Sequence, residues 1–204
     1  MEGIDLVLRQ FPKITEQQQA RFAALGGLYA EWNGRVNLIS RKDLDHLYER
    51  HVLHSLGIAK VHAFKPGTRT VDVGTGGGFP LVPLAILFPD STFHGIDGIG
   101  KKIMAVQGVI DELGLTNCTA GQERSEDHKQ RYDLIVSRAV TTLTEFLRMT
   151  KHLVPKGKGK LLYLKGGDLA KELRPVRQKL RVYELSAFFP EEFFATKKVV
   201  EVEL

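Results

Sequence analysis

The sequence predicts an α/β protein built on a mostly parallel sheet, and three observations predict it. Short β-rich runs alternate with amphipathic segments from Arg69 onward, which is the pattern of consecutive βαβ units. A glycine-rich turn follows the first of these runs. The 204 residues are 43% hydrophobic, which is enough to bury the core that such a sheet needs.

The residues before this alternation are predicted to be helical. Thr15 and Gln18 have the spacing of a capping box, and the apolar residues that follow recur at helical spacing. A second helix is predicted over residues 43–61, with Ser40 as its N-cap, and Pro66-Gly67 then interrupts the chain. We therefore expect an N-terminal helical extension, residues 1–65, and a Rossmann-like domain, residues 66–204, that together form one compact unit.

The remaining elements follow in alternation. Strands are predicted at 69–73, 92–96, 118–120, 132–136 and 161–164, and helices at 80–88, 101–113 and 142–153. Residues 181–185 and 197–203 close the chain, and Val200 and Val202 alternate with Glu201 and Glu203. Such alternation is typical of strands with one solvated face, so a terminal antiparallel pair is expected.

Composition limits the class of protein. The net charge of +5 favours polyanionic partners such as nucleic acid, although an ordinary basic protein has the same charge. Cys118 is the single cysteine, which leaves no partner for a disulfide and no cysteine cluster for zinc. No apolar run approaches the ~18 residues of a membrane span. We expect a soluble cytoplasmic protein without a membrane partner or metal, and, since nothing signals oligomerisation, a monomer.

The turn Asp72-Val73-Gly74-Thr75-Gly76-Gly77-Gly78 carries the chemistry. A strand that leads through glycines into a helix presents backbone N–H groups to a ligand at close range. The dinucleotide fingerprint requires glycine at the sixth position, where Phe79 stands, and no Gly-Lys-Ser/Thr ending marks a phosphate loop. The spacing resembles the first motif of class I methyltransferases that use S-adenosylmethionine (SAM), so Asp72, Gly74, Thr75, Gly76, Gly78 and Phe79 are predicted to line the cofactor site.

Residues after three other strands complete the predicted site. Asp97 follows the second strand, where a carboxylate can accept hydrogen bonds from ribose hydroxyls, or alternatively cap the next helix. Residues 122–126, which include Ser125 and Glu126, offer a wall for adenine or form a solvated charged loop. Arg138 stands where the active crevice of an open α/β sheet lies. The alternative interpretation is that Arg138 is an exposed arginine that pairs with a local carboxylate.

The combination resembles the bacterial 16S ribosomal RNA guanine-N7 methyltransferases, the family of glucose-inhibited division protein B. The motifs that carry the resemblance span nearly the whole chain: Trp32-Asn33, Asn37-Leu38-Ile39-Ser40, Arg50-His51-Val52-Leu53, the glycine turn through Phe79-Pro80, Asp97 before Gly100-Lys101-Lys102, Ser137-Arg138-Ala139 and Leu164-Lys165-Gly166. The resemblance implies SAM as cofactor, the 16S rRNA of the small ribosomal subunit as partner, and cofactor contacts at Gly74, Phe79, Ser125, Glu126 and Arg138.

Three positions depart from the family pattern. His54 precedes Ser55 where relatives commonly carry aspartate, Leu81 stands at a position that is usually glycine, and Gly98 at one that is usually serine.

The implied chemistry needs few side chains. Guanine N7 has a lone pair and no proton, so transfer requires alignment and electrostatics rather than a general base. Arg138 is predicted to orient the cofactor or the guanine, and Arg35, Arg41, Arg50, Lys101 and Lys165 to reach RNA phosphates. A methyltransferase acting on a protein or small molecule, and a SAM-binding RNA or assembly factor without catalysis, are the alternatives.

Overall fold

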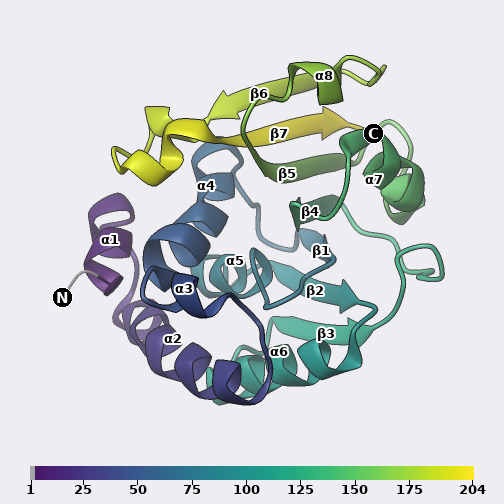
Figure 1. The fold of residues 1–204 in the computed structure, drawn as a ribbon. Coiled ribbons are helices and arrows are strands. Elements are labelled where there is room, and N and C mark those ends of the chain that lie inside the picture. Colours follow the sequence, from purple (N-terminus) through teal and green to yellow (C-terminus); the bar gives the residue numbers. More distant parts are fainter. Residues whose placement is uncertain (1–2) are drawn as a thin grey trace.

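The computed structural model describes residues 3–204 and contains one seven-stranded sheet in the order β3-β2-β1-β4-β5-β7-β6. The first five strands pair in parallel, and β7 is antiparallel to both β5 and β6. Figure 1 shows β6 and β7 at one edge. The predicted parallel sheet with a terminal antiparallel pair is confirmed. The strands are β1 (Arg69–Val73), β2 (Thr92–Asp97), β3 (Cys118–Gln122), β4 (Leu134–Arg138), β5 (Lys160–Gly166), β6 (Leu180–Glu184) and β7 (Lys197–Glu203).

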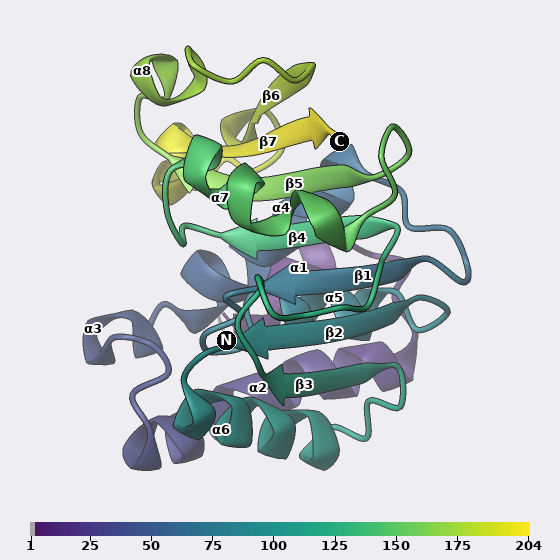
Figure 2. The same cartoon turned by 90° about the vertical axis from the view of Figure 1, so that its right-hand side faces the viewer.

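Helices cover both faces of the sheet (Figures 1 and 2). One core cluster joins the N-terminal helices, α5 and α6 to one face, and a second joins α7 to the other. The helices are α1 (Gly3–Gln10), α2 (Glu16–Arg35), α3 (Arg41–Leu44), α4 (His54–Val61), α5 (Leu81–Leu87), α6 (Gly100–Glu112), α7 (Leu143–Thr150) and α8 (Ala170–Leu173). Short 3₁₀ turns span Lys151–Leu153, Leu185–Ala187 and Glu192–Thr196.

The N-terminal extension begins as its caps predict. The Thr15 hydroxyl accepts from the Gln18 N–H at 3.2 Å while the Gln18 side chain accepts from the Thr15 N–H at 2.8 Å, a complete capping box. Phe22, Leu25 and Tyr29 of α2 are fully buried, in the cluster that also holds residues of α5 and α6. Residues of 1–65 and of 66–204 thus share one hydrophobic cluster.

The helix predicted over residues 43–61 is wrong as a single element. Ser40 does cap α3, but α3 ends at Leu44, and a π-helical turn spanning Tyr48–Leu53 precedes α4. The Tyr48 hydroxyl donates to the Phe22 carbonyl at 2.8 Å. The π-helical turn is thus in tertiary contact with α2, and side-chain periodicity gives no sign of such a contact. π-helical turns occur often at functional sites.

Other boundaries moved by a few residues. The strand predicted at 132–136 begins at Leu134, because the Tyr132 N–H instead donates to the Leu153 carbonyl at 2.7 Å. The same strand runs on to Arg138, which therefore lies at its carboxyl end. Among the described residues, no helix is long and apolar enough to cross a membrane.

Candidate active site

The glycine turn joins β1 to α5 at the carboxyl ends of the parallel strands. Gly74, Gly76 and Gly78 have φ angles of 71°, 57° and 85°, left-handed values that glycine adopts without a steric cost. The N–H groups of Gly74 and Thr75 both donate to the Ile96 carbonyl of β2, at 2.9 and 3.1 Å. The turn is therefore fixed to the neighbouring strand.

Asp72, at the fourth position of β1, is hydrogen-bonded to residues of the glycine turn and of α5. Its carboxylate is fully buried, and its Oδ2 accepts from the Thr75 hydroxyl at 2.7 Å and from the Leu81 N–H at 3.2 Å. Its Oδ1 is buried without a hydrogen-bond partner among the described residues. Burial raises the pKa of Asp72 to about 7. Thr75, itself 2% exposed, thus faces Asp72 rather than the cleft.

Asp97, the last residue of β2, is hydrogen-bonded to the glycine turn. Its Oδ2 accepts from the Gly76 N–H at 3.0 Å and its Oδ1 from the Ile99 N–H at 2.9 Å. Helix α6 starts at Gly100 with Ile99 as its N-cap residue, so Asp97 is not the cap that the alternative interpretation proposed. The partly exposed carboxylate is held rigidly beside the glycine turn.

A cleft of about 350 Å³ opens at the carboxyl ends of β1 and β2. Its walls include Gly74, Asp97, the segment 123–126 and three apolar side chains, Ile99, Val140 and Met149. Ile99 is 45% and Val140 44% exposed, and such exposure of apolar groups in a concave site suits a flat aromatic ligand. Sequence reasoning missed these three residues, although Ile99 lies two positions after Asp97.

The loop after β4 forms the far wall of the cleft. Ala139 has a φ of 49°, a strained value for a residue with a side chain. The Tyr163 hydroxyl holds the loop by accepting from the N–H groups of Val140 and Thr141, each at 3.0 Å. A Cβ on Gly74 would lie 2.6 Å from the Val140 Cγ2, so only glycine allows this approach.

Segment 123–126 is more than a solvated loop. The Ser125 side chain is buried and donates to the Glu126 carboxylate at 2.8 Å, while Glu126 is exposed. The buried His128 ring contacts the Glu123 carboxylate at 2.6 Å through Nδ1 and the Tyr132 hydroxyl at 2.9 Å through Nε2. These contacts anchor the segment at the edge of the cleft.

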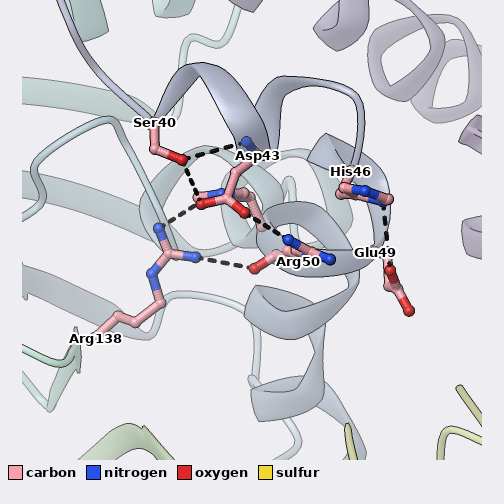
Figure 3. A network of polar contacts seen from close by, with 7 residues as sticks. Ser40, Asp43, His46, Glu49, Arg50 and Arg138 are labelled. Atoms are coloured by element: carbon pink, nitrogen blue, oxygen red, sulfur yellow. Dashed lines mark hydrogen bonds and ion pairs between the residues drawn. The ribbon is translucent and has the colours of Figure 1, made fainter. Parts of the chain in front are cut away.

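Arg138 extends from the end of β4 toward the N-terminal extension (Figure 3). Its Nη2 lies 3.0 Å from the His51 Nδ1, and its Nη1 donates to the Arg50 carbonyl at 3.4 Å. The guanidinium carbon lies 5.3 Å from the centre of the Phe79 ring, a cation–π distance. The Phe79 ring is 2% exposed and also packs on Tyr29 and His51.

Burial and positive charge set the protonation of this cluster. Burial lowers the pKa of Arg138 to about 10, so the guanidinium stays charged at neutral pH. Burial, and then the charge of Arg138, lower the pKa of His51 to about 3. His51 is therefore neutral, and its Nδ1 accepts the hydrogen bond from Arg138. Arg138 has no local carboxylate ion pair among the described residues.

The structure shows the surroundings of two of the three departures from the family pattern, His54 and Leu81. His54 is 6% exposed and its ring meets Phe193 and Phe194 edge-on, and burial keeps its pKa far below the usual value. A neutral ring thus replaces the acidic group expected near the cleft. Leu81 is fully buried, and a Cβ on Gly95 would lie 2.5 Å from its Cδ2. Leu81 fills the space that Gly95 leaves.

The residues predicted to contact RNA do not form one group. Arg41 and Lys101 are exposed, and Arg35 is exposed while paired with Glu31 at 2.6 Å. Arg35 and Arg41 border a hollow of about 580 Å³ in the loop between α2 and α3. Arg50 is partly buried and pairs with Asp43 at 2.8 Å (Figure 3).

Lys165 lies apart from the other predicted RNA contacts. Its ammonium pairs with Glu172 at 2.8 Å and donates to the Thr141 carbonyl at 2.6 Å, and the side chain is only 12% exposed. In this arrangement Lys165 supports the loop that carries Val140. Within residues 3–204, no cluster of three or more His, Cys, Asp or Glu side chains could hold a metal ion.

The sheet order and the glycine turn beside a carboxylate-lined cleft define a class I methyltransferase. Solved structures agree on the fold: a SAM-dependent methyltransferase from Aquifex aeolicus superposes with a TM-score of 0.60 at 17% identity, covering 80% of this chain and 98% of that one. A ribosomal protein L11 methylase from Lactobacillus delbrueckii subsp. bulgaricus gives 0.55 at 13% identity, over 74% and 76%.

Sequence comparison gives the family. The family model "GidB: rRNA small subunit methyltransferase G" matches residues 18–199. Proteins named Ribosomal RNA small subunit methyltransferase G are 52% identical in Flavobacterium johnsoniae, over 98% of both chains, and 50% identical in Bacteroides thetaiotaomicron, over 97% of this chain and 98% of that one. The chain belongs to this family.

Proposed function

We propose that this enzyme transfers a methyl group from SAM to N7 of a guanine in the 16S rRNA of the small ribosomal subunit. The observation that carries the proposal is the cleft between the glycine turn and segment 123–126, with Asp97 fixed at its base. The name of the family and its relatives supports a small-subunit rRNA as substrate. We further propose that it acts as a monomer in the cytoplasm.

The residues present fit SAM. Gly76 and Gly98 have no side chain within 4 Å of where a Cβ would stand, so a ligand can lie close to the backbone. The Asp97 carboxylate has capacity for ribose hydroxyls beyond the two backbone N–H groups that it already accepts. Ile99 and Val140 offer apolar surface to adenine. The Asp72 Oδ1, which has no hydrogen-bond partner among the described residues, is a further acceptor next to the glycine turn.

The chain's own residues supply alignment rather than proton transfer. When bound, SAM supplies a methyl group on a positively charged sulfur. Guanine N7 carries a lone pair and no proton, so no side chain has to remove a proton there. Arg138, fixed by His51 and by the Phe79 ring, is proposed to orient the cofactor or the guanine. Ser125 and Glu126 are proposed to contact the adenosine part.

Two exposed regions near the carboxyl ends of the parallel strands are proposed to bind RNA phosphates. Arg41 and Arg35 border the hollow of the α2–α3 loop, and Lys101 lies in the first turn of α6, two positions after the cleft residue Ile99. The loop is anchored because the Asn33 side chain accepts from the N–H groups of Leu38 and Ile39, at 2.8 and 3.0 Å. Fixed cations near the cleft position RNA without reading its bases.

The test is methyl transfer with mapping. The protein is incubated with labelled SAM and either intact small subunits or stripped rRNA, and the label is located by cleavage at N7-methylguanine. We expect label at a guanine N7, and Arg138→Ala should abolish it. Label in protein, label at another base, or SAM binding without transfer would contradict the proposal.

A matched pair of aspartates tests the cofactor site. Asp97→Asn should weaken SAM binding by about tenfold, since a charge-assisted hydrogen bond to a ligand contributes about 1.5–3 kcal/mol. Asp111→Asn, an exposed position on α6, is the control and should leave SAM binding unchanged. Isothermal titration measures both, and equal affinities in the two variants would remove Asp97 from the site.

A further inference from the structure

A second basic hollow lies on the opposite side of α7 from the cofactor cleft. It measures about 250 Å³ and is lined by Arg148 and Lys151 from α7 and its 3₁₀ extension, and by Arg177 from the segment that leads to β6. Figure 2 shows α7 in front of the sheet and the α8–β6 segment above it. Met149 lines the cofactor cleft, so neighbouring residues of one helix serve both cavities.

The three cations of this hollow are not neutralised by ion pairs within the part of the chain that the structure describes. Among residues 3–204, Arg148, Lys151 and Arg177 form no ion pair. Glu126, the carboxylate on which the charge of Arg148 acts, accepts a hydrogen bond from the Ser125 hydroxyl at 2.8 Å. Glu172 and Glu203 pair with other lysines, Lys165 at 2.8 Å and Lys179 at 2.9 Å. Unpaired like charges that converge on a hollow repel one another, which favours an anionic ligand there.

The chain segment that forms one wall is itself strongly basic. Residues 171–181 contain five basic residues and a single acidic one, Glu172, and all five basic residues are exposed. Leu173 and Val176 pack against the second core cluster. The apolar residues thus fix the segment against the domain while its charges remain in solvent.

We infer that this hollow binds backbone phosphates of the rRNA at a second contact surface, separate from the target guanine. The inference rests on the proposed rRNA substrate. Two guanidinium groups suit phosphate oxygens because their N–H donors form a planar fork. The Thr144 hydroxyl and the Gln178 amide in the same hollow add neutral donors. A helix is about 10–12 Å across, so RNA that reaches the cleft can extend over α7 to this surface.

The experiment compares two triple variants with equal charge loss. One carries Arg148→Gln, Lys151→Gln and Arg177→Gln. The control carries Lys13→Gln, Lys65→Gln and Arg131→Gln, three exposed positions outside both cavities. Binding of each full-length protein to stripped 16S rRNA and to intact small subunits is measured over a range of salt concentrations. SAM affinity and thermal midpoint are recorded to verify that both variants are folded.

The hollow variant should bind stripped rRNA at least about tenfold more weakly, and its salt slope should fall by about 1 for each phosphate that is no longer bound. The control should keep the wild-type slope, with unchanged SAM affinity in both variants. Equal slopes in the two variants would overturn the inference. A weakening confined to intact subunits would also overturn it, because it would assign the surface to an acidic ribosomal protein. Mapping the methylation made by the wild-type protein tests the proposed function independently of these binding measurements. Failure of the proposed function can therefore be distinguished from failure of this inference.

Discussion

Replacing His51 with alanine removes the one side chain within residues 3–204 that accepts a hydrogen bond from Arg138. The Arg138 Nη2 lies 3.0 Å from the His51 Nδ1, and among the described residues its other acceptor is the Arg50 carbonyl at the longer distance of 3.4 Å. Leaving a charged donor without its acceptor in a partly buried site costs about 1–3 kcal/mol. We expect this cost to appear as lower stability or as weaker SAM binding.

The conservative variant distinguishes orientation from packing. In His51→Asn, the amide oxygen can stand near the position of Nδ1 and accept from Arg138, although the shorter side chain no longer packs a ring on Phe79. We therefore expect His51→Asn to recover most of the SAM affinity that His51→Ala loses, but not all of the stability. Urea unfolding gives the stability and titration gives the affinity. Equal SAM affinities in the two variants would refute the proposed role of the hydrogen bond.

The same residue carries a pH signature. The folded-state pKa of His51 is about 3, below its ordinary value of 6.5, so between these values the unfolded chain binds more protons than the folded one. This contribution to stability is complete above pH 6.5 and is lost as pH falls toward 3. His51→Asn should show a shallower loss of stability over that window.

Two further predictions concern the turn and its neighbouring loop. The pKa of Asp72 is raised from 3.8 to about 7, so its contribution is complete below pH 3.8 and is lost as pH rises through 7. Unfolding from pH 4 to 8 should therefore show wild-type stability falling relative to Asp72→Asn, and parallel curves would contradict the raised pKa. Tyr163→Phe removes the hydroxyl that accepts from Val140 and Thr141, and should weaken SAM binding about tenfold. Tyr183→Phe on β6 is the control, and equal binding by the two variants would count against the loop as a wall of the cleft.

Local patterns were sufficient to predict much of the fold. The capping box at Thr15 and the cap at Ser40 depend on residues close together in sequence, and both are present. The strand predicted over 197–203 also forms, but the prediction of one solvated face is wrong at Glu201. This residue is only 6% exposed and pairs with Lys160, because β7 lies between β5 and β6. The glycine turn and Asp97 were likewise predictable, because parallel strands bring their carboxyl ends to one edge.

Long-range contacts account for what the sequence did not reveal. Arg138 meets His51 across 87 positions, and Lys165 is engaged by Glu172 rather than left free for RNA. The exposed apolar residues Ile99 and Val140 look like core residues in the sequence. Only the placement of the strand ends shows that they line a cleft.

The position of Arg138 also bears on how this protein can be divided. Both hydrogen-bond acceptors of its guanidinium, the His51 ring and the Arg50 carbonyl, belong to the N-terminal extension. A shortened chain that began at residue 66 would retain the glycine turn and Asp97, yet Arg138 would be left without those acceptors and Phe79 without two of its ring neighbours. The N-terminal extension is therefore an integral part of the site around Arg138. Grafting residues 66–204 alone into another protein should not reproduce the active site.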